Sequence, residues 1–239
     1  LLIDDDLSAL DQDFTLPPDY RSRLLAFRDG MLRRLLSLVT HVVAPSERIL
    51  AYYGKKHGLL LDPVQCHGTA ALAHHKPTRK RLDVVFAATR SHLGDLELVT
   101  PALANFFSQR PDARLTTFLN GHAPRMLRRL DNAIHLSPMS WERYRSFVSA
   151  NRFHIALAPA HDTAFNKARS VSKLHDHAGF GAAGLYSALP PFSGIVGHGK
   201  SGLLLSNEPE AWSRTLTELA ADPALTLDLA AGGQALSVS

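Results

Sequence analysis

Cysteine and long apolar stretches are both scarce in this sequence. Its 239 residues include one cysteine, Cys66, so an internal disulfide framework is excluded. No stretch approaches the roughly 20 consecutive apolar residues that a membrane-spanning helix needs. No secretory signal pattern is visible, although the sequence starts at Leu1 without a methionine. We therefore expect a cytoplasmic protein in a reducing compartment.

Aromatic residues are also few, at 8% of the chain, whereas basic residues exceed acidic ones. The formal net charge is +4, the isoelectric point is about 9.4, and the bases cluster. Such clusters favour an anionic partner without identifying it. We expect no nucleic-acid partner, because the chain lacks stacking aromatic platforms and a recognisable nucleic-acid-binding motif. The clusters are Arg21, Arg23, Arg28, Arg33 and Arg34, and then His74, His75, Lys76, Arg79, Lys80 and Arg81.

From Leu82 onward, short apolar runs alternate with amphipathic segments. This alternation predicts an α/β domain over residues 82–239, with a Rossmann-like, doubly wound parallel sheet covered by helices on both faces. Ligands of such sheets bind outside the carboxyl ends of the strands. The expected strands are 84–88, 115–119, 133–136, 154–159, 183–187 and 202–206. The expected helices are 95–109, 124–130, 141–150, 170–180 and 208–220.

Residues 1–60 differ in character and are expected to be mainly helical. Their pattern predicts a long helix over Tyr20–Val39, with leucines, Phe27 and Met31 on one side and arginines on the other. We interpret it as a domain helix with a solvated basic face. The alternative is a helix that lies on an anionic membrane surface as a peripheral contact.

Residues 40–81 complete this first part. Thr40–Gly58 predicts a strand, an N-cap at Ser46 and a helix that Gly58 stops. Residues 61–81, rich in Pro, His and Lys, are expected to be a linker.

The stretch Gly194–Gly202 contains G-x-x-x-x-G-K-[ST], the pattern with which P-loop proteins cradle phosphates. That function needs a strand before the loop and a helix after it. Here two adjacent prolines precede the loop, and a strand-like apolar run follows it. We therefore interpret the stretch as a glycine-rich loop that leads into an edge strand.

A stronger candidate site lies in His161–Ser187. Ser170, Lys173 and Asp176 are spaced by three residues, so they share one face at the start of a helix that follows a strand. Lys173, with Arg169, could neutralise a diphosphate there, while Asp176 could accept hydrogen bonds from sugar or ribose hydroxyls. The alternative is an N-capped helix with an exposed Lys–Asp pair.

This block resembles the donor-binding, carboxyl-terminal domain of two-domain GT-B glycosyltransferases of the group 1 type. In that family FN, then K-S, then S-x-x-K-x-x-E-Y-x-A-x-G-x-P recur. This chain has Asp176 in place of the glutamate and Ala183 in place of the proline. Ala168 stands where the wider superfamily often has a further acid. The other aligned residues are Phe165, Asn166, Ser170, Lys173, His177 (at the tyrosine) and Gly181.

Segments 1–10, 42–58, 84–103 and 199–225 are similar to other parts of the same family, so the resemblance spans nearly the whole chain. It implies that residues 1–60 are the carboxyl-terminal remnant of an acceptor-side first domain, and that 82–239 form the donor-binding domain. Because catalysis in the family occurs between the domains, acceptor-side residues are expected to lie outside this sequence. No catalytic residue is therefore assigned.

The resemblance implies transfer of a hexosyl or deoxyhexosyl group from a nucleotide-diphosphate sugar to a hydroxyl of a glycan, lipid or protein, as in polysaccharide biosynthesis. The fragment itself could be inactive, and a non-catalytic nucleotide-sugar-binding module is the alternative. Segments 120–124 and 138–141 would border the nucleotide base. The implied donor-binding residues are Thr89, Arg90, His92, Asn166, Arg169, Ser170, Lys173 and Asp176.

Metal ligands were considered at the acidic run Asp4–Asp6 and among the thirteen histidines. GT-B enzymes generally offset the leaving diphosphate with basic groups and a helix start rather than with an obligatory metal. The acidic run is interpreted as solvated or capping, and the histidines and Cys66 lack the spacing of a ligand set. We expect no structural zinc, no obligatory metal and no cofactor.

Overall fold

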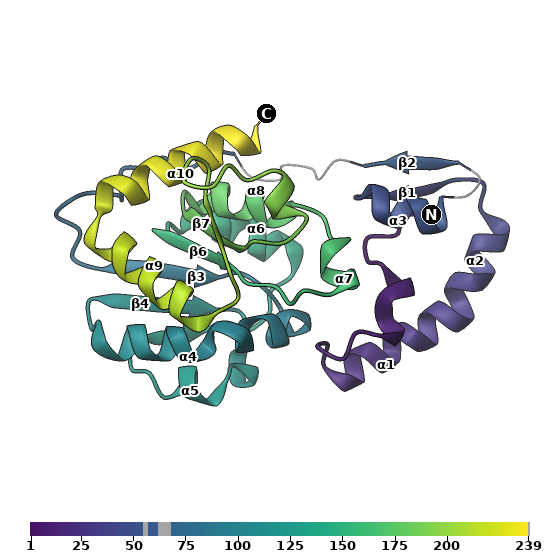
Figure 1. Cartoon of the computed structure of the whole chain (residues 1–239), viewed down its shortest axis with the longest axis horizontal. Helices are drawn as coiled ribbons and strands as arrows, with labels where there is room; N and C mark the ends of the chain where they lie inside the picture. Colours follow the sequence, from purple (N-terminus) through teal and green to yellow (C-terminus); the bar gives the residue numbers. More distant parts are fainter. Residues whose placement is uncertain (55–56, 62–67, 239) are drawn as a thin grey trace.

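The computed structural model describes residues 1–54, 57–61 and 68–238. Its larger part is built on a six-stranded parallel sheet with the strand order β5-β4-β3-β6-β7-β8 (Figure 1). Counted from β3, this is the strand order of the Rossmann fold, which confirms the predicted doubly wound sheet. The strands are β3 Leu82–Phe86, β4 Ala113–Thr117, β5 Ala133–His135, β6 Ile155–Ala158, β7 Ala183–Ser187 and β8 Leu203–Leu205.

Alternate residues of the strands point to opposite sides of the sheet, and they are apolar on both sides. Helices therefore cover both faces. Val84 and Phe86 pack into one core, whereas Val85 packs into another on the opposite face. One face carries α4 Leu93–Gln109, α5 Arg125–Arg128 and α9 Pro209–Ala221 (Figure 1). The other carries α6 Trp141–Ala150, α8 Ser172–Phe180 and α10 Pro223–Ser237. Helix α10 was not expected from the pattern.

The glycine-rich stretch is a loop, as predicted, and not a phosphate-binding turn. After the 3-10 turn Phe192–Gly194, the chain leads into β8 at the sheet edge, and no helix begins there. The loop is closed on itself, since the N–H groups of Lys200 and Ser201 both donate to the Gly197 carbonyl. The Ser201 hydroxyl in turn accepts from the Gly197 N–H.

The amino-terminal segment begins with the short helix Leu7–Asp11, followed by a long helix made of α1 Pro18–Phe27, a π-helical turn Arg28–Leu32 and α2 Arg33–Leu38. The long helix was predicted, but its apolar side was placed too broadly. Leu32 is buried, whereas Phe27 is 43% exposed and Met31 is 57% exposed. The leucines that do pack belong to, or lie against, one small hydrophobic cluster. The buried side of the helix is therefore narrower than its apolar stripe.

A pair of short parallel strands follows, β1 Val42–Ala44 and β2 Gly58–Leu60, with α3 Glu47–Tyr53 between them. Ser46 caps α3 as predicted, because its hydroxyl accepts from the Ile49 N–H. The predicted stop at Gly58 was wrong: α3 ends at Gly54. Gly58 is already paired with Val42, so strand pairing ends the helix earlier than the pattern predicted.

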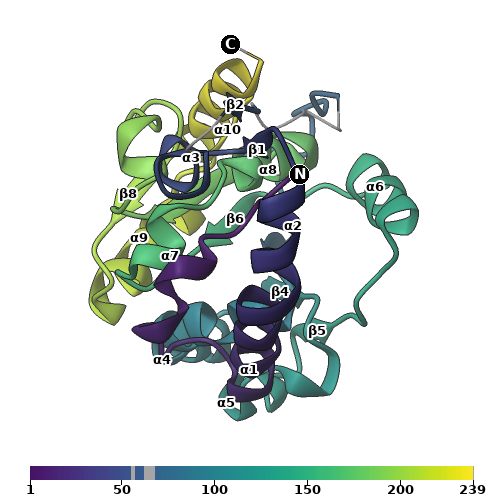
Figure 2. The same cartoon turned by 90° about the vertical axis from the view of Figure 1, so that its right-hand side faces the viewer.

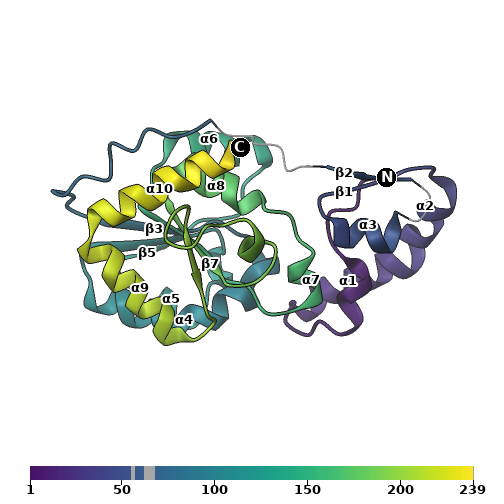
Figure 3. The ribbon, with the colours of Figure 1, turned by 45° about the horizontal axis from the view of Figure 1, so that its top comes forward.

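The short helix α7 Ala164–Lys167 joins the two parts of the molecule (Figure 3). Phe165 and Ala168 are fully buried in a cluster whose other members come from residues 1–50. The Ser46 hydroxyl donates to the Ala168 carbonyl at 2.6 Å. A shared core therefore fixes the amino-terminal segment against the carboxyl edge of the sheet. In the end-on view, the long helix of this segment runs in front of that edge (Figure 2).

Part of the predicted linker, residues 62–67 with Cys66, lies outside the described residues. Residues 68–81 form no regular element, but they are fixed to the amino edge of the sheet. A ring nitrogen of His75 contacts the Gly181 carbonyl at 2.8 Å, and one of His74 contacts the Phe153 carbonyl at 2.9 Å. His154 packs against both rings, and burial lowers the pKa of His75 and of His154 to about 4.

The contact between α10 and the glycine-rich loop predicts a matched pair of variants. A Cβ at Gly232 would lie 1.9 Å from the Lys200 carbonyl oxygen, whereas a Cβ at Gly30 meets nothing within 4 Å. Gly232→Ala should therefore destabilise the protein by about 1–3 kcal/mol, and Gly30→Ala should be neutral or stabilising by up to about 1 kcal/mol. Urea denaturation measures both, and equal effects of the two substitutions would contradict the packing.

Buried His75 predicts a stability that depends on pH. Unfolded His75 binds a proton below pH about 6.5, whereas the folded residue binds one only near its pKa of about 4. The free energy of unfolding should therefore fall as the pH falls between these values, by at most about 1.4 kcal/mol per pH unit from this residue. His75→Gln keeps a donor for Gly181 and should flatten the slope in urea denaturation. Exposed His122→Gln is the control, and parallel curves for wild type and His75→Gln would show the argument to be wrong.

Candidate functional site

Two adjoining cavities open at the carboxyl edge of the sheet, where β3 and β6 lie side by side. Their volumes are about 400 Å³ and about 260 Å³. Crossover connections leave β3 and β6 toward opposite ends of the sheet, and such a switch point leaves a crevice for ligands. Four residues line both cavities: Ala88, His92, Ser172 and Lys173. A single elongated ligand could therefore occupy both.

The larger cavity, here called the aromatic cavity, is lined by aromatic and apolar residues and by polar groups of α8. The rings of Trp141 and Tyr144 stack with centroids 6.0 Å apart. Segment 138–141 was predicted to border a base and does line this cavity, whereas the described walls do not include 120–124. The walls not shared with the second cavity are Ala87, Thr89, Phe118, Pro138, Met139, Trp141, Tyr144, His175 and Asp176.

The smaller cavity, here called the polar cavity, carries charged groups from both parts of the molecule. Asp4, Asp5 and Tyr20 come from the amino-terminal segment. From the sheet domain come the ends of β3 and β6, the start of α4 and the loop before α8. Beyond the shared residues, the polar side chains of that domain in its walls are Ser91, Asp95, Asn166, Arg169 and Ser170.

Lys173 stands where the two cavities meet. Its side chain is 24% exposed, and its ammonium group donates to the Ala87 carbonyl at the end of β3. It also lies 3.3 Å from a carboxylate oxygen of Asp176. The predicted face forms only in part, because α8 begins at Ser172 and Ser170 lies before it. Ser170 lies in the wall of the polar cavity, Asp176 in that of the aromatic cavity, and Lys173 in both.

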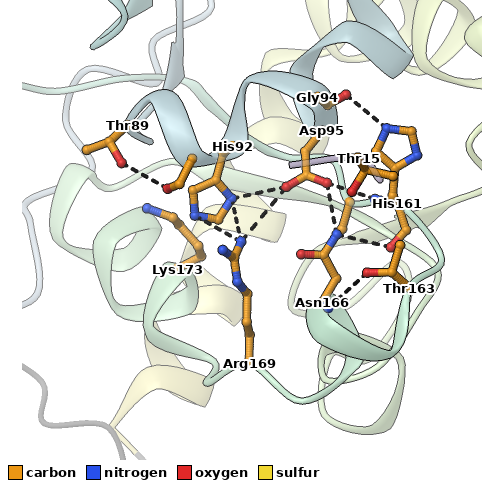
Figure 4. A network of polar contacts seen from close by, with 12 residues as sticks. Thr15, Thr89, His92, Gly94, Asp95, His161, Thr163, Asn166, Arg169 and Lys173 are labelled. Carbon is orange, nitrogen blue, oxygen red and sulfur yellow. Dashed lines mark hydrogen bonds and ion pairs between the residues drawn. The ribbon is translucent and has the colours of Figure 1, made fainter. Parts of the chain in front are cut away.

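A hydrogen-bonded network fixes the rest of the polar cavity (Figure 4). The Asp95 carboxylate accepts from the His161 N–H and from the Asn166 amide, both at 2.9 Å. Its second oxygen lies 3.1 Å from Nδ1 of His92. The guanidinium Nη1 of Arg169 lies 2.8 Å and 3.1 Å from the two ring nitrogens of His92. The network thus connects α4, the loop after β6 and the approach to α8.

The network sets the charges of its members. Burial, with the nearby Arg169 guanidinium, lowers the pKa of His92 to about 4, so the imidazole is neutral at pH 7. Burial opposes ionisation of Asp95, but hydrogen bonds from His92 and the His161 N–H hold its pKa below the ordinary value. Burial raises the pKa of Asp5, which Arg169 partly offsets from 3.7 Å.

Beneath the site, His177 fixes α8 to the sheet. It stacks on the Tyr186 ring of β7, with Nδ1 3.0 Å from the Tyr186 hydroxyl. Burial lowers the pKa of His177 to about 3 and raises that of Tyr186. This neutral pair sets the position of the helix that carries Lys173 and Asp176.

Seven of the eight predicted donor-binding residues line one or both cavities, and Arg90 does not. The guanidinium of Arg90 lies 3.2 Å from the Asp19 carboxylate, at the surface between α1 and α4. Its position gives no support to a contact with a diphosphate. Thr89 lies in the wall of the aromatic cavity and is exposed.

Sequence reasoning missed Asp95, Asp5 and Tyr20. The sequence did contain a signal that could have identified Asp95, because an acid in the first turn of a helix after a buried strand faces the carboxyl edge of the sheet. Asp5 was considered only as part of an acidic run. Within that run, Asp6 caps the helix that starts at Leu7 by accepting from the Ser8 N–H, whereas Asp5 reaches Arg169.

Within residues 1–54, 57–61 and 68–238, no group of three or more His, Cys, Asp or Glu side chains is arranged to hold a metal ion. None of the helices in these ranges is long and apolar enough to cross a bilayer.

No protein-family model matches the chain, and no curated protein matches it in sequence. Solved structures do match. HepE of Anabaena, in complex with UDP and glucose, aligns at a TM-score of 0.64 and 12% identity, over 99% of this chain and 65% of HepE. Sucrose-phosphate synthase of Thermosynechococcus elongatus aligns at 0.62 and 16% identity, over 97% of this chain and 61% of that enzyme.

The carboxyl-terminal domain of LpcC of Francisella tularensis, a group 1 glycosyltransferase, aligns at a TM-score of 0.55 and 14% identity, over 72% of this chain and 93% of that domain. The chain therefore spans less than two thirds of HepE and of sucrose-phosphate synthase, but it covers nearly all of the isolated domain. At these identities the likeness concerns the fold. The chain has the fold of the carboxyl-terminal domain of GT-B glycosyltransferases, with an additional segment packed against its carboxyl edge.

Proposed function

We propose that the two cavities bind a nucleotide-diphosphate sugar, and that the chain is the donor-binding part of a glycosyltransferase for hexosyl or deoxyhexosyl groups. The observation that carries the proposal is Lys173, whose ammonium group stands between an aromatic cavity and a polar one. Such a ligand has an aromatic base at one end, a polar sugar at the other and two negative phosphates between them. HepE, which has a similar fold, has been solved with UDP-glucose.

The aromatic cavity suits the nucleoside. Phe118, Trp141 and Tyr144 offer ring faces on which a planar base can stack. Asp176 lines the same cavity, close enough to the Tyr144 hydroxyl to help raise its pKa, and offers carboxylate oxygens to the ribose hydroxyls. Both groups line one cavity of about 400 Å³, a size typical of small-molecule sites.

The diphosphate belongs at the junction and the sugar in the polar cavity. Lys173 and Arg169 place two cations there, and Ser170 adds a hydroxyl at the approach to α8. A guanidinium presents a planar set of donors that suits phosphate oxygens. Asn166, Tyr20 and Asp5 are among the further polar groups of that cavity and suit the hydroxyls of the sugar.

In the proposed transfer, the bond between the anomeric carbon and the diphosphate oxygen breaks, and a hydroxyl oxygen of a glycan, lipid or protein acceptor bonds to that carbon. The bonding electrons leave with the diphosphate, and the acceptor loses a proton. The contribution of this chain is electrostatic, since Lys173 and Arg169 face the charge that develops on the leaving group. Preorganised groups of this kind lower barriers by several kcal/mol without requiring a metal. The group that accepts the proton of the acceptor is not assigned.

A non-catalytic nucleotide-sugar-binding module is the second candidate, because the walls described here supply donor contacts and no assigned base. Calorimetric titration with UDP-glucose, GDP-mannose and dTDP-glucose tests binding. Slow release of nucleoside diphosphate from the bound sugar, or its acceleration by an acceptor, would favour the transferase. Binding without any turnover would favour the module.

Removing the central ammonium group predicts a specific loss of affinity. Lys173→Ala should weaken binding of the nucleotide sugar by about 10–100-fold, because a charge-assisted contact contributes about 1.5–3 kcal/mol. Lys167→Ala is the matched control, since Lys167 pairs with Asp162 outside both cavities. Calorimetry measures both variants. Equal affinities of Lys173→Ala and wild type would rule out the proposed position of the diphosphate.

We also propose peripheral membrane contact through the helix 18–38. Phe27, Met31 and Leu38 are all exposed on it, close in sequence to Arg23 and Arg34. An exposed apolar row beside arginines suits an anionic lipid surface.

This contact predicts binding to phosphatidylglycerol vesicles that phosphatidylcholine vesicles do not reproduce. Phe27→Ser with Met31→Ser should reduce the bound fraction several-fold in co-sedimentation, because the apolar anchor is lost. Leu225→Ser, at an exposed leucine of α10, is the control. An unchanged bound fraction in the double variant would contradict the proposal.

A further inference from the structure

His92 occupies an unusual position at the junction of the two cavities. It lines both of them, beside Lys173. Its Nδ1 faces the Asp95 carboxylate at 3.1 Å, and Nη1 of Arg169 lies within 3.1 Å of both of its ring nitrogens (Figure 4). The imidazole is thus held between an anion and a cation.

These contacts require a neutral imidazole. Nη1 of Arg169 lies 2.8 Å from Nδ1 and 3.1 Å from Nε2, so its N–H can be accepted only by the one ring nitrogen that carries a lone pair. A protonated imidazole has no lone pair to offer and would place two cations in contact. Arg169 in this position and a charged His92 therefore exclude each other. The pKa of about 4 for His92, set by burial and by Arg169, agrees with this geometry.

Arg169 holds its other partners more loosely. It lies 3.7 Å from the nearer oxygen of Asp5 and 3.9 Å from that of Asp95, beyond ordinary hydrogen-bond distance. Its guanidinium also lies 4.9 Å from the centre of the Phe165 ring. A diphosphate, which a guanidinium can bind through two parallel hydrogen bonds, is a stronger partner than any of these.

We propose that binding of a nucleotide sugar moves the Arg169 guanidinium from His92 to the diphosphate, and that His92 then takes up one proton from solvent. The imidazolium then donates Nδ1–H to Asp95 and Nε2–H to a phosphate oxygen. This inference rests on the proposed function. It gives the site a third positive charge, beside Lys173 and Arg169, only when an anion is present.

The charges around His92 determine the direction of the effect. Arg169 and Lys173 oppose its protonation, whereas Asp95 favours it, and Asp5 acts from the amino-terminal segment by offsetting Arg169. The diphosphate adds negative charge and draws Arg169 away, so both changes favour the imidazolium. Because the complex then binds more protons than the free protein, the affinity should rise as the pH falls from 8 toward 5.

Titration calorimetry in two buffers of different ionisation enthalpy counts the protons taken up. The probes are UDP-glucose, GDP-mannose and dTDP-glucose at pH 6.5, because the diphosphate of a nucleotide sugar is esterified at both ends and does not itself titrate near neutral pH. We expect an uptake approaching one proton per bound nucleotide sugar. His92→Asn keeps a donor for Asp95 and should bind with no uptake, whereas His122→Asn, at an exposed histidine, should match the wild type.

The outcomes separate the two proposals. No binding of any of the three probes would overturn the proposed function. Binding without proton uptake, or with equal uptake in His92→Asn, would overturn the coupling alone.

A second measurement needs no ligand and does not depend on the fold of His92→Asn. In Arg169→Gln, the neighbouring cation is gone, so the histidine Cε1–H signal of His92 should titrate at a higher pH than in the wild type, as measured by NMR. An unchanged titration would contradict the contact on which the coupling depends.

Discussion

The carboxylate of Asp95 is the constraint on which the candidate site depends. It is 5% exposed, and a buried carboxylate is tolerated only when its oxygens are hydrogen-bonded. Its partners come from different places: His92 from the start of α4, and the His161 N–H and Asn166 from the connection after β6. Satisfying this one side chain therefore ties together the loops that leave β3 and β6. The two loops are therefore held together, and the crevice between them has fixed walls.

The amino-terminal segment completes this wall through packing. Phe165 is fully buried among residues of the segment, and α7, which carries it, immediately precedes Arg169. The position of Arg169 therefore depends on a hydrophobic core that includes residues from the other part of the molecule. Gly94 contributes to the same fit, since a Cβ there would lie 2.4 Å from the Thr15 carbonyl oxygen. The polar cavity is in this sense a property of both parts together.

The sheet was predictable from sequence because strands buried on both faces form continuous apolar runs. The bounds of strand β7 Ala183–Ser187 and of helix α6 Trp141–Ala150 were both predicted to the residue. Lys173 and Asp176 were predictable because spacing along one helix is a local property. The pairing of Arg169 with His92 spans 77 residues and depends on the docking of α7, so no local pattern contained it. The early end of α3 was not predicted for the same reason, because Gly58 pairs with Val42 of the neighbouring strand.

One departure from the family pattern, at Ala168, agrees with the same packing. Ala168 stands where the wider superfamily often has an acid, and here this position is fully buried, with its carbonyl held by Ser46. A carboxylate at this point would enter an apolar core, which is unfavourable. The segment that builds this core contributes Asp4 and Asp5 to the polar cavity, beside Asp95 of the sheet domain. A single interface therefore both excludes an acid at position 168 and supplies two others.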